Sequence, residues 1–295
     1  MSPDRIHRAV SADGTEIAGP VTGDGPPLVL AHGGLDDGTI SWETMLPLLR
    51  EHYTCFLPSM RGRGLSADHP DQRPERHAEG LAAFIDRIGE PVAVVGYSTG
   101  AYYALGAAQR GAAISALALY ESPVFACFDG EAEDLERFRA GVAGMAQAAE
   151  RGDLTEAARQ FMRGVSNDDE MATMEPTDAF ERFGRFVPNL LRVLEQAGDA
   201  EAADFNEPSE LARVTVPTLL LYGTRTTSGH TESTMLLAER LPEARLARVP
   251  GAGHCAPVLA PEAVTDEIRA FLRTVLTTSS RPVLIDHLRC DGAAR

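Results

Sequence analysis

A serine between two glycines stands where an apolar run gives way to a helical pattern. The run Pro91–Val95 is typical of a buried strand, and Ala101–Arg110 has the composition of a helix. Between them lies Gly96-Tyr97-Ser98-Thr99-Gly100. Glycine has no Cβ, so the two glycines allow strand and helix to pass closely. The segment predicts a sharp turn that exposes the Ser98 hydroxyl as a nucleophile; without those flanks it would indicate only a Gly/Ser-rich turn.

Strand and helix patterns alternate along most of the chain. Besides the run before Ser98, we expect strands at Ile6–Val10, Glu16–Val21, Pro27–Ala31, Tyr53–Leu57, Ile114–Tyr120, Thr218–Tyr222 and Arg245–Val249. Helices are expected at Ser41–Arg50, Pro74–Ile88, Thr231–Arg240 and Pro261–Leu276. The first two strands flank Asp13-Gly14, which indicates a hairpin. The alternation predicts an α/β protein with a mostly parallel central sheet and helices on both faces.

The alternation stops between Ser122 and Pro217. This stretch holds only helical patterns, at Leu135–Arg151, Leu154–Met162 and Ala179–Glu195. It is too long to be a connecting loop. We therefore predict a helical cap, residues 122–208, inserted into a core formed by residues 1–121 and 209–295. Open α/β sheets bind ligands at the carboxyl ends of their strands, so the cap should cover that edge.

The third of these predicted helices has an apolar face, formed by Phe180, Phe183, Val187, Leu190, Leu191 and Leu194. Packing of the cap on the core and lining of a hydrophobic substrate pocket both remain open for these side chains. The pocket candidates are Tyr97, Phe180 and Phe183.

Charge and composition exclude some classes of protein. The chain has 295 residues and a formal net charge of -16, which argues against binding to a nucleic-acid backbone or an anionic membrane surface. No signal pattern opens it, and no run approaches the ~18 apolar residues of a membrane helix. The scattered cysteines, of which Cys55 and Cys127 resemble buried hydrophobes, indicate no disulfide framework. We expect a soluble, cytoplasmic protein.

Four motifs, each at the end of a predicted strand, give the chain a wider resemblance. They are His32-Gly33-Gly34, Arg61-Gly62-Arg63-Gly64-Leu65-Ser66, the segment around Ser98, and Gly251-Ala252-Gly253-His254. In this order they resemble the α/β-hydrolase fold superfamily over residues 5 to 276. The resemblance implies a catalytic triad in the chain order nucleophile, acid, histidine. It also implies an oxyanion hole formed by the backbone N–H groups of Gly34 and Thr99.

A serine hydroxyl is a poor nucleophile unless a neighbouring base takes its proton as it attacks. The resemblance places His254, at the end of the fourth motif, in that role. His32 and His230 are expected in loops, and the remaining histidines, His7, His52, His69, His77 and His287, stand in terminal or surface-like contexts.

The acid departs from the commonest pattern of the superfamily. Its usual place, after the strand Thr218–Tyr222, holds no carboxylate, and Thr226 stands about where aspartate is expected. Glu121 directly follows the strand Ile114–Tyr120 on the same edge of the sheet. We therefore predict Glu121 as the triad acid, against the alternative of a solvated or cap-anchoring glutamate.

Two further positions bear on the branch of the superfamily. Ser59 stands where many relatives carry a loop-bracing aspartate, which suggests a specialised branch. Ser98 argues against epoxide hydrolases and haloalkane dehalogenases, because both use aspartate as nucleophile.

The sequence thus predicts a serine hydrolase that cleaves an ester, thioester or lactone of a small to medium, mostly apolar molecule through an acyl-enzyme. A cyclase or lyase on the same scaffold, and a ligand-binding protein without turnover, remain alternatives. No cofactor or metal is expected, and the partner is a small-molecule substrate rather than a nucleic acid or a membrane. The tail Thr277–Arg295 is compatible with packing on the body, with a homodimer or with a loose end.

Overall fold

An eight-stranded sheet forms the centre of the protein. The computed structural model describes residues 5–124, 132–197 and 204–279. The strands are β1 (Arg5–Val10), β2 (Glu16–Thr22), β3 (Pro27–Ala31), β4 (Thr54–Phe56), β5 (Val92–Tyr97), β6 (Ile114–Tyr120), β7 (Thr218–Gly223) and β8 (Ala244–Val249). Their spatial order is β1-β2-β4-β3-β5-β6-β7-β8. β2 pairs antiparallel with β1 and β4, and all other pairs are parallel. The predicted hairpin and mostly parallel sheet are confirmed.

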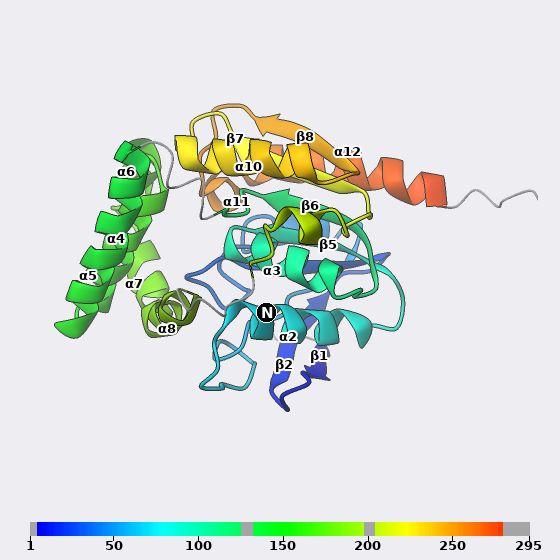
Figure 1. Ribbon diagram of the computed structural model, residues 1–295, viewed down its shortest axis with the longest axis horizontal. Helices are drawn as coiled ribbons and strands as arrows, with labels where there is room; N and C mark the ends of the chain where they lie inside the picture. The colour runs from blue at the N-terminus through cyan, green and yellow to red at the C-terminus, as the bar shows by residue number, and fades with distance from the viewer. Residues whose placement is uncertain (1–4, 125–131, 198–203, 280–295) are drawn as a thin grey trace, which may run out of the picture.

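Helices cover both faces of this sheet (Figure 1). On one face lie α2 (Pro74–Asp86), α3 (Thr99–Gln109) and α10 (Ser228–Arg240), whose apolar side chains form one buried cluster with the strands. On the other face α1 (Leu46–Leu49) and α12 (Pro261–Ser279) contribute to a second cluster. Two further short helices, α9 (Pro208–Leu211) and α11 (Ala256–Leu259), precede β7 and α12. The central strands β3, β5, β6 and β7 are buried on both faces, which explains their continuous apolar sequences.

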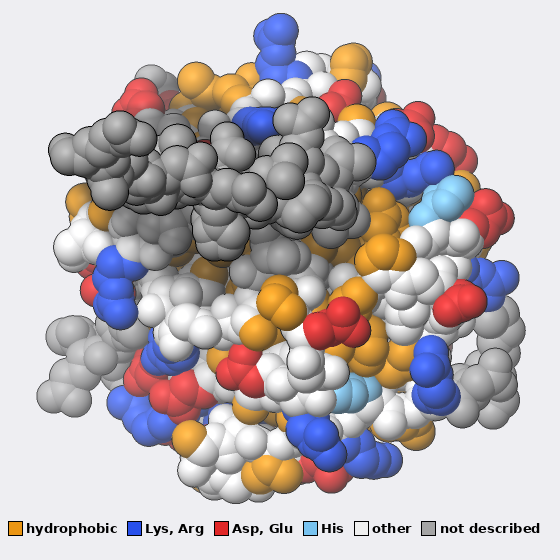
Figure 2. Space-filling view, turned by 90° about the vertical axis from the view of Figure 1, so that its right-hand side faces the viewer, with side chains coloured by type: hydrophobic (Ala, Val, Ile, Leu, Met, Phe, Trp, Pro, Cys, Tyr) orange, Lys and Arg blue, Asp and Glu red, His pale blue; other side chains and the backbone are white. Residues whose placement is uncertain are grey.

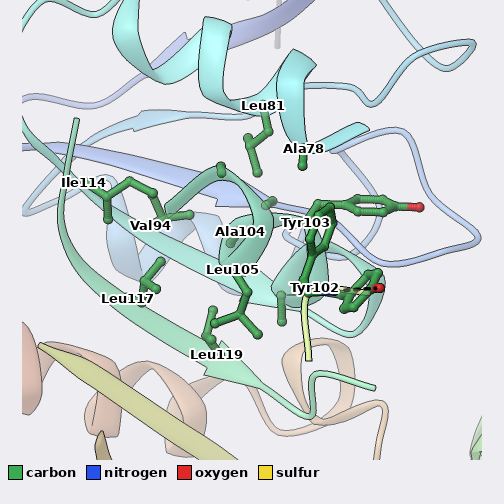
Figure 3. Close-up of a cluster of buried hydrophobic side chains, with 14 of the residues drawn as sticks. Ala78, Leu81, Val94, Tyr102, Tyr103, Ala104, Leu105, Ile114, Leu117 and Leu119 are labelled. Carbon is green, nitrogen blue, oxygen red and sulfur yellow. Dashed lines mark hydrogen bonds between the residues drawn. The ribbon is translucent and has the colours of Figure 1, made fainter. Parts of the chain in front are cut away.

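The packing of α2 and α3 against β5 and β6 fixes the helix that follows Ser98. Leu81 of α2, Leu105 of α3 and Leu117 of β6 meet in the first of these clusters (Figure 3). The ring of His77, expected near the surface, is instead buried and stacks on Tyr103 with ring centroids 4.6 Å apart. His77 lies on the core-facing side of α2, which its neighbours in sequence did not indicate.

A separate group of helices lies beside one end of the sheet (Figure 1). These are α4 (Ala132–Glu150), α5 (Leu154–Val165), α6 (Asp168–Met174), α7 (Ala179–Gly184) and α8 (Val187–Ala197). They lie between β6 and β7 in the chain and have their own apolar cluster. The group corresponds to the helical insertion that the sequence predicts, and its boundaries at residues 122 and 208 and its role as a cap stay predictions.

Two helix predictions were wrong in extent or number. The single helix expected at Ala179–Glu195 is broken into α7 and α8, because Pro188 lacks the N–H that would bond to Gly184. Pro47 similarly limits the helix expected over Ser41–Arg50 to α1. The short helix α6 was not expected, and it begins with a capping box in which Asn167 and Glu170 bond each other's backbone N–H groups.

The end of the molecule away from the cap shows basic and acidic side chains interspersed where described residues reach the surface (Figure 2). Within the part of the chain that the structure describes, none of the helices is both long and apolar enough to cross a membrane. Cytoplasmic location stays a prediction.

Cys55 is buried as expected, whereas Cys127, His287 and the tail beyond Ser279 lie outside the described residues.

Candidate active site

Ser98 occupies a strained turn between β5 and α3. Its backbone angles are φ 52° and ψ -122°, a conformation that costs a non-glycine residue about 1–3 kcal/mol. A Cβ on Gly96 would lie 2.5 Å from Cα of Ala101, and one on Gly100 would lie 2.2 Å from the carbonyl oxygen of Ala31. Both contacts are with backbone, so only glycine fits at either position. The turn therefore has the sharp form that the sequence predicted.

Glu121 lies one strand away, directly after β6. Tyr97 and Tyr120 are partners in the parallel register of β5 and β6, so Ser98 and Glu121 leave the sheet side by side. Glu121 also has a positive φ, 46°, and its side chain is fully buried. One carboxylate oxygen accepts from the N–H of Gly223 at 2.9 Å, and the other accepts from the hydroxyl of Thr226 at 3.0 Å. Thr226, which stands at the commonest acid position, thus donates a hydrogen bond to the carboxylate of Glu121, the residue that follows β6.

His254 joins these two side chains. Its Nδ1 lies 2.7 Å from Oε2 of Glu121, and its Nε2 lies 3.2 Å from Oγ of Ser98. With the proton on Nδ1, the ring donates to Glu121 and accepts from the Ser98 hydroxyl. The carbonyl oxygen of the preceding Gly253 accepts from the Tyr120 hydroxyl at 2.6 Å. The structure therefore brings the three predicted residues into one hydrogen-bonded chain.

The electrostatics of this chain favour a neutral imidazole. Burial lowers the pKa of His254, because the imidazolium would lose its solvation. Burial raises the pKa of Glu121, and the N–H of Gly223, the hydroxyl of Thr226 and the nearby His230 oppose that change. The Glu121 carboxylate in turn favours a proton on His254, so the two side chains titrate as a pair.

A pH profile tests this arrangement. An active site of this kind needs one proton on the Glu121–His254 pair, and a second proton ends activity. Because burial lowers the pKa of His254 from 6.5, we expect kcat/KM for a p-nitrophenyl ester to be retained at pH 6.5 and to fall only below it. Circular dichroism over the same range checks that the protein stays folded. An acid limb centred at or above pH 6.5 would contradict the expectation.

The two expected oxyanion-hole residues lie near each other beside Ser98. Thr99 is the first residue of α3, so its N–H has no acceptor within its own helix. A Cβ on Gly34 would lie 3.1 Å from the Thr99 side-chain oxygen and 3.4 Å from Leu190 of the cap. The position of Gly34 is therefore close to the nucleophile, and its role stays a prediction.

A cavity of about 340 Å³ opens over Ser98 and His254 between core and cap. Tyr97 and Phe183, two of the three pocket candidates, line it, and their contact with a substrate stays a prediction. Phe180 instead packs inside the cap with the guanidinium of Arg159 over its ring, so its side chain does not line this cavity. A second cavity of about 60 Å³ also reaches Ser98 and is lined by Leu190 and Leu194. The apolar face predicted for the third cap helix thus both packs inside the cap and lines the two cavities.

His230 is the neighbour that the sequence did not reveal. It lies in the first turn of α10, is buried, and stacks on His254 with ring centroids 4.1 Å apart. Its Nδ1 is 2.9 Å from the Thr227 hydroxyl. Only the contact between α10 and the loop of His254 brings the rings together, and no local pattern reports that contact.

Glu121, His230 and His254 also bring possible metal-ligand atoms within 4.8 Å of one another. However, the two rings are stacked at an interplanar angle of 25°. Imidazole lone pairs lie in the ring plane, so one ion at bonding distance cannot lie in both planes. The cluster does not fit a metal centre.

Comparison with known proteins agrees with this fold. A profile of the alpha/beta hydrolase family matches residues 28–267, and the chain therefore belongs to that family. A 2-hydroxy-6-oxo-6-(2'-aminophenyl)hexa-2,4-dienoic acid hydrolase of Metapseudomonas resinovorans is 26% identical over 90% of this chain and 91% of its own.

Solved structures show the same architecture. An alpha/beta hydrolase from Sphaerobacter thermophilus is 27% identical, with a TM-score of 0.70 over 90% of this chain and 99% of its own. An esterase from a Rhodococcus species, 22% identical, has a TM-score of 0.75 over 92% of this chain and 99% of its own. The second likeness bears on the fold alone.

Proposed function

We propose that the protein is a serine hydrolase that cleaves an ester, thioester or lactone of a small to medium apolar molecule. The observation that carries the proposal is the hydrogen-bonded chain from Ser98 through His254 to Glu121. Nucleophile, base and acid lie within the distances that proton transfer requires, under a cavity open to a ligand.

In this mechanism Ser98 attacks the substrate carbonyl while His254 takes the hydroxyl proton through Nε2. The N–H groups of Gly34 and Thr99 stabilise the oxyanion, and Glu121 stabilises the imidazolium. The imidazolium returns its proton to the leaving group, which departs and leaves an acyl group on Ser98. His254 then activates a water molecule that attacks the acyl carbon, and release of the acid restores the Ser98 hydroxyl.

The cavity walls favour a neutral, apolar substrate. Its lining is mostly apolar, including Met162, Val165 and Phe183 of the cap. Among the described lining residues, Glu43 and Asp178 outnumber the single guanidinium, that of Arg182, and the carboxylate of a third acid, Asp36, accepts from the backbone N–H groups of its own loop. That guanidinium is held 2.6 Å from Glu43. A carboxylate on the substrate would meet net negative charge here, so the acid named in the relative from Metapseudomonas resinovorans is not the substrate class we infer.

Covalent labelling tests the function. We expect a fluorophosphonate to form an adduct on Ser98, identified by peptide mass spectrometry. We also expect hydrolysis of p-nitrophenyl esters, either with an initial burst of p-nitrophenol or at a rate that saturates with ester concentration. Ser98→Ala is the matched control and should remain unlabelled. Absence of labelling with turnover of another substrate would favour a cyclase or lyase, and absence of both would favour a binding protein.

Substrate length should respond to Phe183, which lines the larger cavity without touching the triad. We expect Phe183→Ala to raise kcat/KM for long-chain relative to short-chain p-nitrophenyl esters, because removal of the ring enlarges the apolar cavity. The kcat for the acetate ester should change little, since the reacting groups lie on core loops. An unchanged chain-length profile, measured from acetate to decanoate, would place the acyl chain elsewhere.

A further inference from the structure

A buried carboxylate of the cap contacts the loop that carries His254. Glu170, in the first turn of α6, is only 6% exposed. One of its oxygens accepts from the backbone N–H of Cys255 at 2.6 Å, directly after His254 in the chain. The other accepts from the N–H of Asn167 at 3.1 Å. The side chain is thus fixed at both oxygens, one by its own helix and the other by the catalytic loop.

The two residues that precede α6, Ser166 and Asn167, make further contacts with this part of the core. The amide of Asn167 donates to the carbonyl oxygen of Arg225 at 2.9 Å. Ser166 Oγ lies 3.3 Å from Sγ of Cys255. A Cβ on Gly253 would lie 2.3 Å from the Asn167 amide nitrogen and 2.6 Å from the Glu170 carboxyl group. The glycine before His254 therefore permits a contact that any larger residue would displace.

We propose that Glu170 is a positioning residue that holds His254 in register with Ser98 and thereby makes catalysis depend on the docked cap. This inference rests on the proposed serine-hydrolase function. The carboxylate touches neither Ser98 nor the imidazole, and it acts through the backbone that follows His254. On the other side the Tyr120 hydroxyl bonds to the carbonyl oxygen of Gly253. The peptide segment on either side of His254 is therefore held once by the sheet and once by the cap.

The hydrogen bonds of the buried Glu170 carboxylate hold the loop of His254 more firmly than neutral bonds would. A buried carboxylate is costly unless its oxygens are bonded, and burial indeed raises the pKa of Glu170. The bonds from the backbone N–H groups of Asn167 and Cys255 offset that cost. Such charge-assisted bonds are about twice as strong as neutral ones. Their loss would allow the loop of His254 to shift. A displacement of a catalytic group by about 1 Å can cost about 10²-fold in rate.

Steady-state kinetics with p-nitrophenyl acetate test the proposal, because this small ester needs little from the cavity walls. We expect Glu170→Ala to lower kcat by about 10- to 100-fold with KM within about twofold of wild type. Glu170→Gln should restore most of that kcat, since an amide oxygen still accepts from Cys255. If Glu170→Ala does not fold, Glu170→Asp takes its place with the same expected loss, because its carboxylate is one methylene short of the loop.

Asp169→Asn is the matched control. Asp169 is the neighbouring, exposed acid of α6 and pairs with Arg225 of the core, but no hydrogen bond or ion pair described for its side chain reaches the loop of His254. We expect its kcat to equal that of wild type. The inference is overturned if folded Glu170→Ala or Glu170→Asp keeps wild-type kcat, if either changes KM alone, or if Asp169→Asn loses as much kcat. If wild-type protein fails to turn over any ester, the proposed function fails instead, so the two outcomes are distinguishable.

Discussion

Ser98→Ala is expected to lower kcat for ester hydrolysis by about 10⁶-fold while leaving the fold intact. The alanine removes the nucleophile, but the turn stays shaped by Gly96 and Gly100, and the side chain of Ser98 lies outside the apolar clusters of the core. The measurement is the single-turnover rate with a p-nitrophenyl ester, alongside the thermal unfolding midpoint. Retained turnover of the native substrate would contradict the acyl-enzyme mechanism and favour a cyclase or lyase.

The double variant of Ser98 and His254 sharpens this test. His254→Ala should be nearly as damaging as Ser98→Ala, and the combination should be little worse than either, because nucleophile and base act as one unit. Losses that multiply would show that the two residues work in separate steps.

Glu121→Gln is expected to lower kcat by up to ~10⁴-fold, as for the corresponding change of a triad aspartate. The amide keeps the shape of the carboxylate, but it cannot stabilise an imidazolium by charge and favours the wrong tautomer of His254. Thr226→Ala should cost far less, because it removes one hydrogen bond to Glu121 and leaves the charge in place. Both are measured as kcat for the same ester. A loss on Thr226→Ala as large as that on Glu121→Gln would contradict the assignment.

A second-site change gives an independent check of this assignment. The Thr226 hydroxyl and His254 Nδ1 bond to the same oxygen of Glu121. A carboxylate at position 226 therefore starts close to the ring. We expect Thr226→Asp to recover part of the kcat lost in Glu121→Gln, whereas Thr226→Asn in the same background should recover none. Recovery by both or by neither would argue against a charge-based role for Glu121.

Much of the fold and the core of the site can be predicted because the information is local. Ser98 follows a strand and precedes a helix within a few residues, and Glu121 directly follows the neighbouring strand. Parallel strands end at one edge of a sheet, so their following residues meet without any knowledge of the rest of the molecule. His254 needed the resemblance to the superfamily, because nothing in its own sequence fixes where its loop returns.

Other parts depend on contacts between distant segments. His230 and Glu170 lie beside the loop of His254 only because α10 and α6 pack there, and both have ordinary surface-like neighbours in sequence. Phe180 and Phe183 lie three residues apart in the same short helix α7, yet Phe180 packs inside the cap whereas Phe183 lines the cavity. Periodicity identifies an apolar face but does not state which neighbour covers it.

The pairing of Tyr97 with Tyr120 has a consequence for how the enzyme would fail on heating. Nucleophile and acid leave adjacent, central strands, so they keep their spacing for as long as the sheet persists. The base arrives on a loop outside the sheet, and local openings of loops need less free energy than global unfolding. Inactivation should therefore precede melting of the sheet and be reversible in that interval, with the displaced imidazole as the first part of the machinery to be lost.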